Sequence, residues 1–300
     1  MEKFPNFLIV GAAKSGTTSL FHYLNQHPDV YIPPIKECRF FSQMSSNQKG
    51  LGAEKFQNEG IRDWNEYKKL FTGRREKALG DISNDYFYYY KTSIKNIKKY
   101  LGEKVKIIIV LRNPIDRAYS NYLHHVREGW ENLSFEEALK KEEERIKKGW
   151  AWPYHYVKVG MYYEQVRAYI ENFKNVKIYL YEDLKNIQNF MESLFLFLEV
   201  EPLKLNFNKR YNISGYPKSK MVHYLLIKDN ILKKIFRALL RSFLPEKIRE
   251  EIRFKVMQKN LKKVPMKEET RRNLVEIYRN NVLKLQELIK RDLSMWLSIE

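Results

Sequence analysis

The most regular feature of this 300-residue sequence is an alternation of short apolar runs with longer amphipathic stretches. Largely apolar runs at residues 7–11, 105–111 and 176–181 have the length of a buried strand, and residues 77–83, KALGDIS, predict a further short strand. The run 105–111, VKIIIVL, gives the strongest strand signal, because it is β-branched, nearly all apolar and bounded by charge. Strands separated by helical segments predict an α/β fold, with a parallel sheet and crossover helices.

The stretches between these runs show helical spacing or helix-start signals. Asn113-Pro114 marks one helix start, since proline suits the first helical turn. Residues 28–42 hold three prolines and predict a loop. The remaining helices are expected over 17–25, 61–71, 92–101, 134–148 and 156–172. A further helix follows the strand 176–181 and ends at about 198, and residues 221–296 are expected to be helical throughout. No linker or repeat divides the chain, so we expect one domain over 1–300, with 221–300 as a mostly helical extension of it.

A turn rich in small residues follows the first predicted strand. In GAAKSGTT, residues 11–18, backbone N–H groups can converge on an anion, and the following helix adds its positive end. The candidate anion ligands in this turn are Lys14, Ser15, Gly16, Thr17 and Thr18. An ordinary tight turn between strand and helix is the alternative, because small residues serve that too.

The lysine of this turn is displaced relative to the loop of nucleotide hydrolases, G-x-x-x-x-G-K-[ST]. Gly11 and Gly16 have the required spacing, but Thr17 stands where the lysine should be. A magnesium-dependent hydrolase also needs an acidic residue closing a second apolar strand, and Arg112 stands there instead. The sequence therefore argues against ATP hydrolysis and for an anion held by cations and amides, without a bridging metal.

A second candidate anion site follows the strand 105–111. Arg112 ends this strand, and Ser120 lies about two turns into the helix that Pro114 opens. Arginine offers a bidentate fork to phosphate and serine a hydroxyl, and both would lie at the carboxyl edge of the sheet, as Lys14 would. Two such sites favour a ligand with two separated phosphate-like groups. Alternatively, Arg112 pairs with Asp116 or caps local structure.

The composition narrows the class of partner. The chain has 55 Lys+Arg against 36 Asp+Glu, a net charge of +19, which favours anionic partners such as nucleotides, sulfated molecules, nucleic acid or a membrane surface. A single cysteine excludes an intramolecular disulfide, and six histidines show no metal-ligand spacing. We find no signal peptide and no apolar run long enough to span a bilayer, so we expect a cytoplasmic protein.

Taken together, the two candidate anion sites make the chain resemble the sulfotransferases that use 3′-phosphoadenosine 5′-phosphosulfate (PAPS). Within them it is most similar to the carbohydrate branch, the heparan sulfate enzymes and their bacterial relatives. GAAKSGTTSL matches the family's 5′-phosphosulfate loop, and LRNPIDRAYSNY matches its 3′-phosphate motif. The resemblance implies a P-loop-like central parallel sheet flanked by helices, PAPS as donor, PAP as product, no metal, and a hydroxyl-bearing small-molecule or glycan acceptor.

Further segments extend this resemblance. HPDVYIPPIKECRFFS aligns Glu37 with the proposed catalytic base, and the loop match makes Lys14 the stabiliser of the leaving group. NISGYPKSK resembles a basic loop that closes over PAPS, which implies donor contacts from Lys218, Ser219 and Lys220. The residues alone favour a solvated loop carboxylate paired with Lys36 or Arg39 over a catalytic role for Glu37, and the resemblance reverses that preference.

The chain also departs from the family pattern. LGDISNDYF has Asp81 where the family has glutamate, and Ile82 where the heparan sulfate enzymes have lysine. We keep Asp81 as a reserve base, and both Asp81 and His155 as tentative acceptor contacts. The cytosolic branch uses a histidine base near this strand, and its absence here favours Glu37.

Two alternatives to a sulfotransferase stay open, a P-loop kinase or hydrolase and a non-enzymatic anion or nucleic-acid binder. No recognised nucleic-acid module is present, so we expect no nucleic-acid partner. The basic amphipathic stretch 225–263 either packs on the domain or rests on the inner face of an anionic membrane. The sequence sets neither the acceptor's identity nor the oligomeric state.

Overall fold

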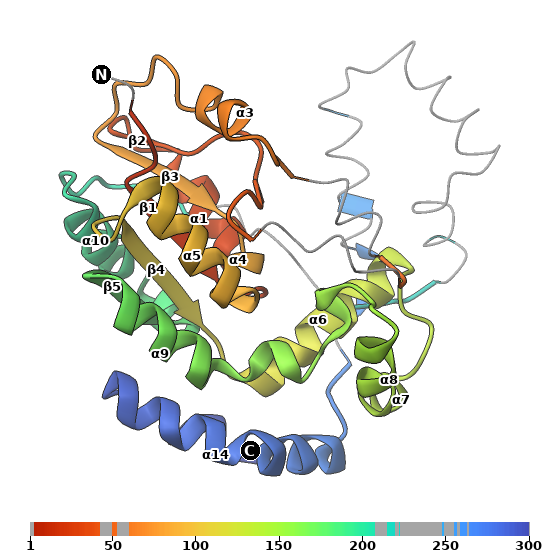
Figure 1. Cartoon of the computed structure of the whole chain (residues 1–300). Coiled ribbons are helices and arrows are strands. Elements are labelled where there is room, and N and C mark those ends of the chain that lie inside the picture. Colours follow the sequence, from red (N-terminus) through yellow and green to blue (C-terminus); the bar gives the residue numbers. More distant parts are fainter. Residues whose placement is uncertain are drawn as a thin grey trace.

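A five-stranded parallel sheet forms the centre of the molecule (Figure 1), in the order β2-β3-β1-β4-β5. The strands are β1 (Phe7–Gly11), β2 (Val30–Tyr31), β3 (Ala78–Ile82), β4 (Lys106–Leu111) and β5 (Asn175–Leu180). The computed structural model describes residues 3–42, 50–52, 60–207, 215–219, 222, 248, 255–256, 259–262 and 264–299. The predicted α/β class and the flanked parallel sheet are confirmed.

Helices cover both faces of this sheet. Their bounds are α1 (Thr17–Leu24), α3 (Trp64–Lys69), α4 (Asp85–Tyr88), α5 (Tyr90–Leu101), α6 (Pro114–Glu128), α7 (Phe135–Lys140), α8 (Glu142–Lys147), α9 (Tyr162–Asn172), α10 (Ile187–Leu198) and α14 (Glu268–Ile289). Short 3₁₀ turns lie at Trp152–Tyr154, Lys158–Gly160, Tyr181–Asn186 and Ser294–Trp296.

The strands supply apolar side chains to two separate cores. Leu8 and Ile109 point to the face covered by α5, α9 and α14, whereas Phe7 and Ile108 point to the face covered by α1 and α10. Because neighbouring strand residues face opposite ways, a strand buried on both faces must be apolar at nearly every position. The unbroken apolar runs of the sequence have this cause.

The connections depart from the predictions at three places. The predicted helix 134–148 is two helices, α7 and α8, and the predicted helix 156–172 begins only at Tyr162. The N–H groups of Val157 and Lys158 donate to the buried carboxylate of Glu142, 2.7 and 2.8 Å away, so this segment is tied to α8. Within 221–296, predicted to be helical throughout, Leu261–Lys262 forms β7, antiparallel to β6 (Tyr216–Pro217).

The described end of the chain belongs to the same core as the sheet. α14 packs against α9 and α6, as Figure 1 shows, and Tyr278, Leu285 and Trp296 are buried in the cluster that contains Leu8. A single domain over the whole chain stays a prediction, since most of 225–263 lies outside the described residues. Among the described residues, no helix has the length and apolar character needed to cross a membrane.

Candidate active site

A cavity of about 850 Å³ lies at the carboxyl ends of β1 and β4. Neighbouring parallel strands end at one edge of the sheet, where ligands of such folds bind. The predicted site residues that line it are Lys14, Gly16, Thr17, Thr18, Glu37, Arg112 and Ser120. Ser15 is fully buried in the same loop and does not line the cavity. The structure therefore brings together both predicted anion sites and the predicted base.

The first anion site is the turn from β1 to α1. The backbone of Gly16 has a φ of 90° at the start of α1, and no side chain caps this helix. The positive end of α1 is thus left for a ligand in the cavity. The N–H of Ala12 donates to the carbonyl of Val110 at 2.8 Å, which ties the beginning of this turn to β4.

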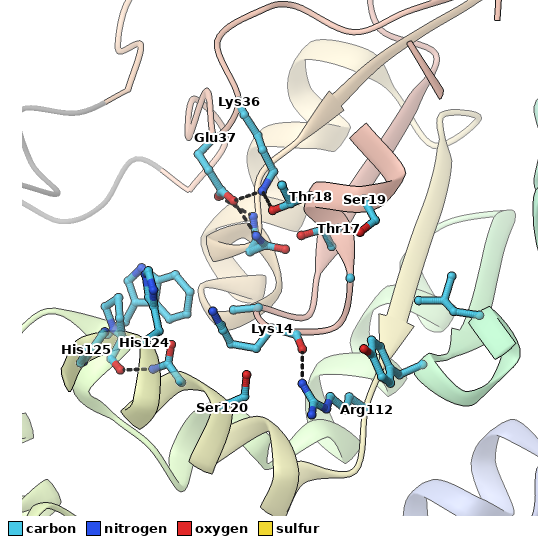
Figure 2. Close-up of a pocket in the computed structure, with 18 of the residues that line it drawn as sticks. Lys14, Thr17, Thr18, Ser19, Lys36, Glu37, Arg112, Ser120, His124 and His125 are labelled. Atoms are coloured by element: carbon cyan, nitrogen blue, oxygen red, sulfur yellow. Dashed lines mark hydrogen bonds and ion pairs between the residues drawn. The ribbon is translucent and has the colours of Figure 1, made fainter. Parts of the chain in front are cut away.

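Lys14 lies between two other cations that line the cavity, Lys36 and Arg112 (Figure 2). Its side chain borders the cavity and is half-buried, and desolvation by the surrounding protein lowers its pKa to about 7. The nearby charges of Arg127, Arg112, Lys36 and Arg117 lower it further, in that order. Its backbone has a φ of 70°, an uncommon conformation for a side chain with a Cβ. A bound anion would reduce the electrostatic repulsion among these neighbouring cations.

The second anion site is formed by β4 and α6. Arg112 donates from Nη1 to the carbonyl oxygen of Lys14 at 3.0 Å, and its guanidinium lies 4.7 Å from the ring centre of Tyr181. Ser120 lines the same cavity from α6. Asp116 is paired instead with Arg271 at 2.5 Å, so the structure gives no support to an Arg112–Asp116 pair. Arg112 therefore joins the two anion sites.

Residues 291–296, after α14, form hydrogen bonds to the residues that follow Arg112 and Tyr181. Asn113 caps α6 through its side-chain oxygen and donates from Nδ2 to the carbonyl of Trp296 at 3.3 Å. Trp296 in turn donates from its indole nitrogen to Glu182 at 3.1 Å, and Arg291 pairs with Asp183 at 2.8 Å. The residues that follow Arg112 and Tyr181 are thereby both tied to Trp296, Asn113 through its backbone carbonyl and Glu182 through its indole.

Glu37 lies on the opposite side of Lys14 from Arg112 in Figure 2, in the loop after β2. Its carboxylate accepts the backbone N–H of Asn84 at 2.8 Å and the side-chain amide of Asn84 at 2.5 Å. Its own N–H donates to the carbonyl of Ile82 at 3.0 Å, and its φ is 66°. The side chain of Glu37 is thus held at the cavity by a loop with an unusual backbone, an arrangement common at functional sites.

Asp81 lies outside the cavity. Its buried carboxylate accepts hydroxyl groups from Tyr67 and Ser83, each at 2.9 Å, and from Tyr86 at 2.7 Å. Burial raises the pKa of Asp81 to about 6, although the three hydroxyl donors oppose that rise. This arrangement makes Asp81 a structural centre at the end of β3, and the geometry does not support a role in acceptor binding or as a reserve base.

His155 is also buried and does not line the cavity. Its Nδ1 shares a hydrogen bond of 2.7 Å with the hydroxyl of Tyr88, and burial lowers its pKa to about 4. This geometry gives no support to the predicted acceptor contact by His155, which stays a prediction. The neighbouring Trp152 does line the cavity.

The predicted basic loop is described only in part. The N–H groups of Lys218 and Ser219 donate to the backbone and side-chain oxygens of Asn260, at 2.6 and 2.9 Å. Neither residue lines the cavity, and Lys220 lies outside the described residues. Donor contacts from this loop stay a prediction.

Several cavity residues were not predicted from the sequence. They are Lys36, Asn84, His124, His125, Trp130 and Tyr181. Lys36 could have been noticed, since it directly precedes Glu37, and the two histidines follow Ser120 by about one helical turn. Nothing in the local sequence marks Asn84 or Tyr181. Within the described part of the chain, no group of three or more His, Cys, Asp or Glu residues could hold a metal.

The sequence model of the sulfotransferase domain family matches residues 4–212. The chain belongs to this family. A crystal structure of a sulfotransferase from Alicyclobacillus acidocaldarius is 33% identical, covers 99% of this chain and 100% of its own, and superposes with a TM-score of 0.75. The match includes the helical C-terminal part as well as the sheet.

Curated relatives match the sulfotransferase over a shorter stretch. Membrane-associated sulfotransferase kil1 of Dictyostelium discoideum is 29% identical over 118 residues, 39% of this chain and 22% of that protein. Bifunctional heparan sulfate N-deacetylase/N-sulfotransferase 1 of Homo sapiens is 28% identical over 134 residues, 41% of this chain and 13% of that protein. The chain thus spans less than a quarter of the length of these relatives.

Proposed function

We propose that this sulfotransferase moves a sulfuryl group from PAPS to a hydroxyl group of a carbohydrate or glycolipid acceptor. The observation that supports this most is the pair of cationic sites, Lys14 with the start of α1 and Arg112 with Ser120, on the walls of one cavity. PAPS carries phosphate groups at two separate positions of one nucleoside, and Glu37 lies beside the first site. The likeness of part of the chain to a heparan sulfate N-sulfotransferase supports a glycan acceptor.

The proposed step is an in-line displacement at sulfur. Glu37 takes the proton of the acceptor hydroxyl, whose oxygen forms a bond to sulfur as the bond from sulfur to the 5′-phosphate oxygen breaks. The electron pair of that bond stays on the phosphate oxygen, which yields PAP. Base catalysis of this kind contributes about 10²–10⁴-fold.

The cations of the cavity supply the electrostatic part of the mechanism. The start of α1, with Thr17 and Thr18, holds the 5′-phosphate, and Arg112 with Ser120 holds the 3′-phosphate. Lys14 neutralises the charge that develops on the leaving oxygen. The donor's negative charge raises the pKa of Lys14 from its value near 7, so binding favours the protonated form that this role needs.

A labelled-sulfate transfer screen from PAPS tests the proposal. The acceptor panel contains glycans, glycolipids, phenols and peptides. We expect transfer to a glycan or glycolipid that persists in EDTA, and loss of nearly all turnover in Glu37→Gln with PAP affinity preserved. Glu143→Gln, at an exposed position of α8, is the matched control.

Three results would contradict parts of this proposal. Binding of ATP–Mg²⁺ in preference to PAP would favour a kinase or hydrolase. Salt-dependent DNA binding without PAP binding would favour a non-enzymatic polyanion binder, which the charge of +19 motivates. Full turnover in Glu37→Gln would remove Glu37 as the base.

A further inference from the structure

The ammonium of Lys36 lies between the two halves of the proposed reaction. Its Nζ donates to Oγ1 of Thr18 at 2.9 Å, in the first turn of α1, and lies 3.6 Å from Oε1 of Glu37. Thr18 belongs to the turn that faces the donor, and Glu37 is the group that faces the acceptor hydroxyl. A sulfuryl group that moves from donor to acceptor passes between these two residues.

The side chain of Lys36 keeps binding capacity in this position. An ammonium has three N–H donors. Among the described residues, only Thr18 is at hydrogen-bond distance from it, because 3.6 Å to Glu37 is beyond a direct hydrogen bond. About a quarter of the side chain is exposed, and it lines the cavity. Lys36 also contributes to the lowered pKa of Lys14, so the two charges interact across the cavity.

We propose that Lys36 is a further catalytic residue, whose ammonium contacts the oxygens of the sulfuryl group in bound PAPS and during its transfer. This inference rests on the proposed function. During the displacement, negative charge is spread over the sulfuryl oxygens, and a cation placed there in advance stabilises the transition state. Lys14 acts on the leaving oxygen, whereas Lys36 acts on the group in transit.

A weaker role for Lys36 is to hold the Glu37 carboxylate in place. The contacts favour catalysis over that role. Asn84 already binds both carboxylate oxygens of Glu37 at shorter distances, and the closest contact of Lys36 is to the donor-side residue Thr18. The two roles also predict different measurements, because PAP lacks the sulfuryl group that PAPS carries.

The first test compares the affinities of PAPS and PAP by calorimetry in the absence of acceptor. Lys36→Met should weaken PAPS binding about tenfold or more while PAP binding changes less than about twofold. Lys95→Met, which removes an equal charge at an exposed position of α5, should change neither. An equal loss for both nucleotides, or no loss for either, overturns the proposal.

The second test uses the first acceptor that the wild type sulfates in the screen described above. Lys36→Met should lower kcat by about 100- to 1,000-fold, the cost of removing one preorganised transition-state donor, and by the same factor at every pH. A loss that disappears at high pH would mean that Lys36 acts through the ionisation of Glu37, and would overturn the catalytic role. If Lys36→Met does not fold, Lys36→Gln, which also removes the charge, replaces it, and an unchanged ratio of PAPS to PAP affinity overturns the proposal.

The binding test also separates this inference from the proposed function. A wild-type protein that binds neither PAP nor PAPS contradicts the proposed function itself. Normal wild-type binding, with no sulfuryl-specific loss in the variants, contradicts only the assignment of Lys36.

Discussion

Asn84 binds both oxygens of the Glu37 carboxylate, one through its backbone N–H and the other through its side-chain amide. Asn84→Ala removes only the second of these bonds. A hydrogen bond to a charged group contributes about 1.5–3 kcal/mol. We therefore expect kcat to fall roughly 10- to 100-fold, with PAP affinity unchanged, as measured by steady-state kinetics and calorimetry.

Unchanged PAP affinity distinguishes loss of orientation from simple loss of structure in Asn84→Ala. Asn65→Ala, at an exposed position of α3, should change neither kcat nor PAP affinity. An intact kcat in Asn84→Ala would show that the side chain of Asn84 does not position the base.

Proton uptake should accompany PAP binding because of Lys14. In the unliganded protein its pKa is about 7, lowered first by burial, so at pH 8 the amine is largely neutral. Bound phosphate groups raise that pKa, and binding then takes up a proton. PAP affinity should fall as pH rises above 7, and calorimetry at pH 8 in buffers of different ionisation enthalpy should detect the uptake.

Replacement of Lys14 checks that assignment. Lys14→Met should abolish the proton uptake at pH 8 and lower both donor affinity and turnover. The second ionisation of a phosphate has a pKa near 6, so PAP itself takes up little proton at this pH. Uptake that survives in Lys14→Met would assign the proton to another group.

Arg112 should discriminate between nucleotides by their 3′-phosphate. Loss of a charge-assisted pair costs about 1.5–3 kcal/mol, so Arg112→Ala should weaken PAP binding roughly 10- to 100-fold. Adenosine 5′-monophosphate, which has no 3′-phosphate, should bind wild type and variant alike. Arg75→Ala, at an exposed position before β3, is the control. Equal losses for both nucleotides would place the 3′-phosphate elsewhere.

Trp296 should be important for stability although it lies only three residues before the last described residue, 299. Its side chain is almost completely buried and its indole N–H donates to Glu182, whereas the bond from Asn113 goes to the backbone carbonyl of Trp296. Trp296→Ala should lower the free energy of unfolding by about 3–5 kcal/mol, measured by denaturant titration. Met295→Ala, at a neighbour that is 55% exposed, should cost far less. Comparable losses in the two variants would contradict a specific role for the indole.

The sequence predicted those features that depend on neighbouring residues. The run 7–11 coincides with β1, and the run 105–111 overlaps β4 except for Val105. Asn113-Pro114 correctly predicted the start of α6, because a side-chain cap and a proline act within one turn. The two anion sites were predicted for a similar reason, since each is a strand end followed directly by a helix start.

Features that depend on distant parts of the chain were not predictable in this way. Asp81 has the same charge as Glu37, and only the fold places three hydroxyl groups around it. The segment after Tyr156 has helical spacing, but Glu142 captures its N–H groups. Lys36 and Asn84 gain their significance only because β3 and the loop after β2 lie side by side.

Under the proposed function, the hydrogen bond from Arg112 to the carbonyl of Lys14 fixes the distance between the two phosphate sites of the donor. β1 and β4 are directly paired, so the two anion sites they carry cannot drift independently. The cavity should therefore select ligands by the distance between their charged groups and not only by their total charge. ATP carries as much negative charge as PAP, but all of it lies on one 5′-triphosphate chain. Under the proposed function, ATP would therefore leave the 3′-phosphate site of Arg112 and Ser120 empty.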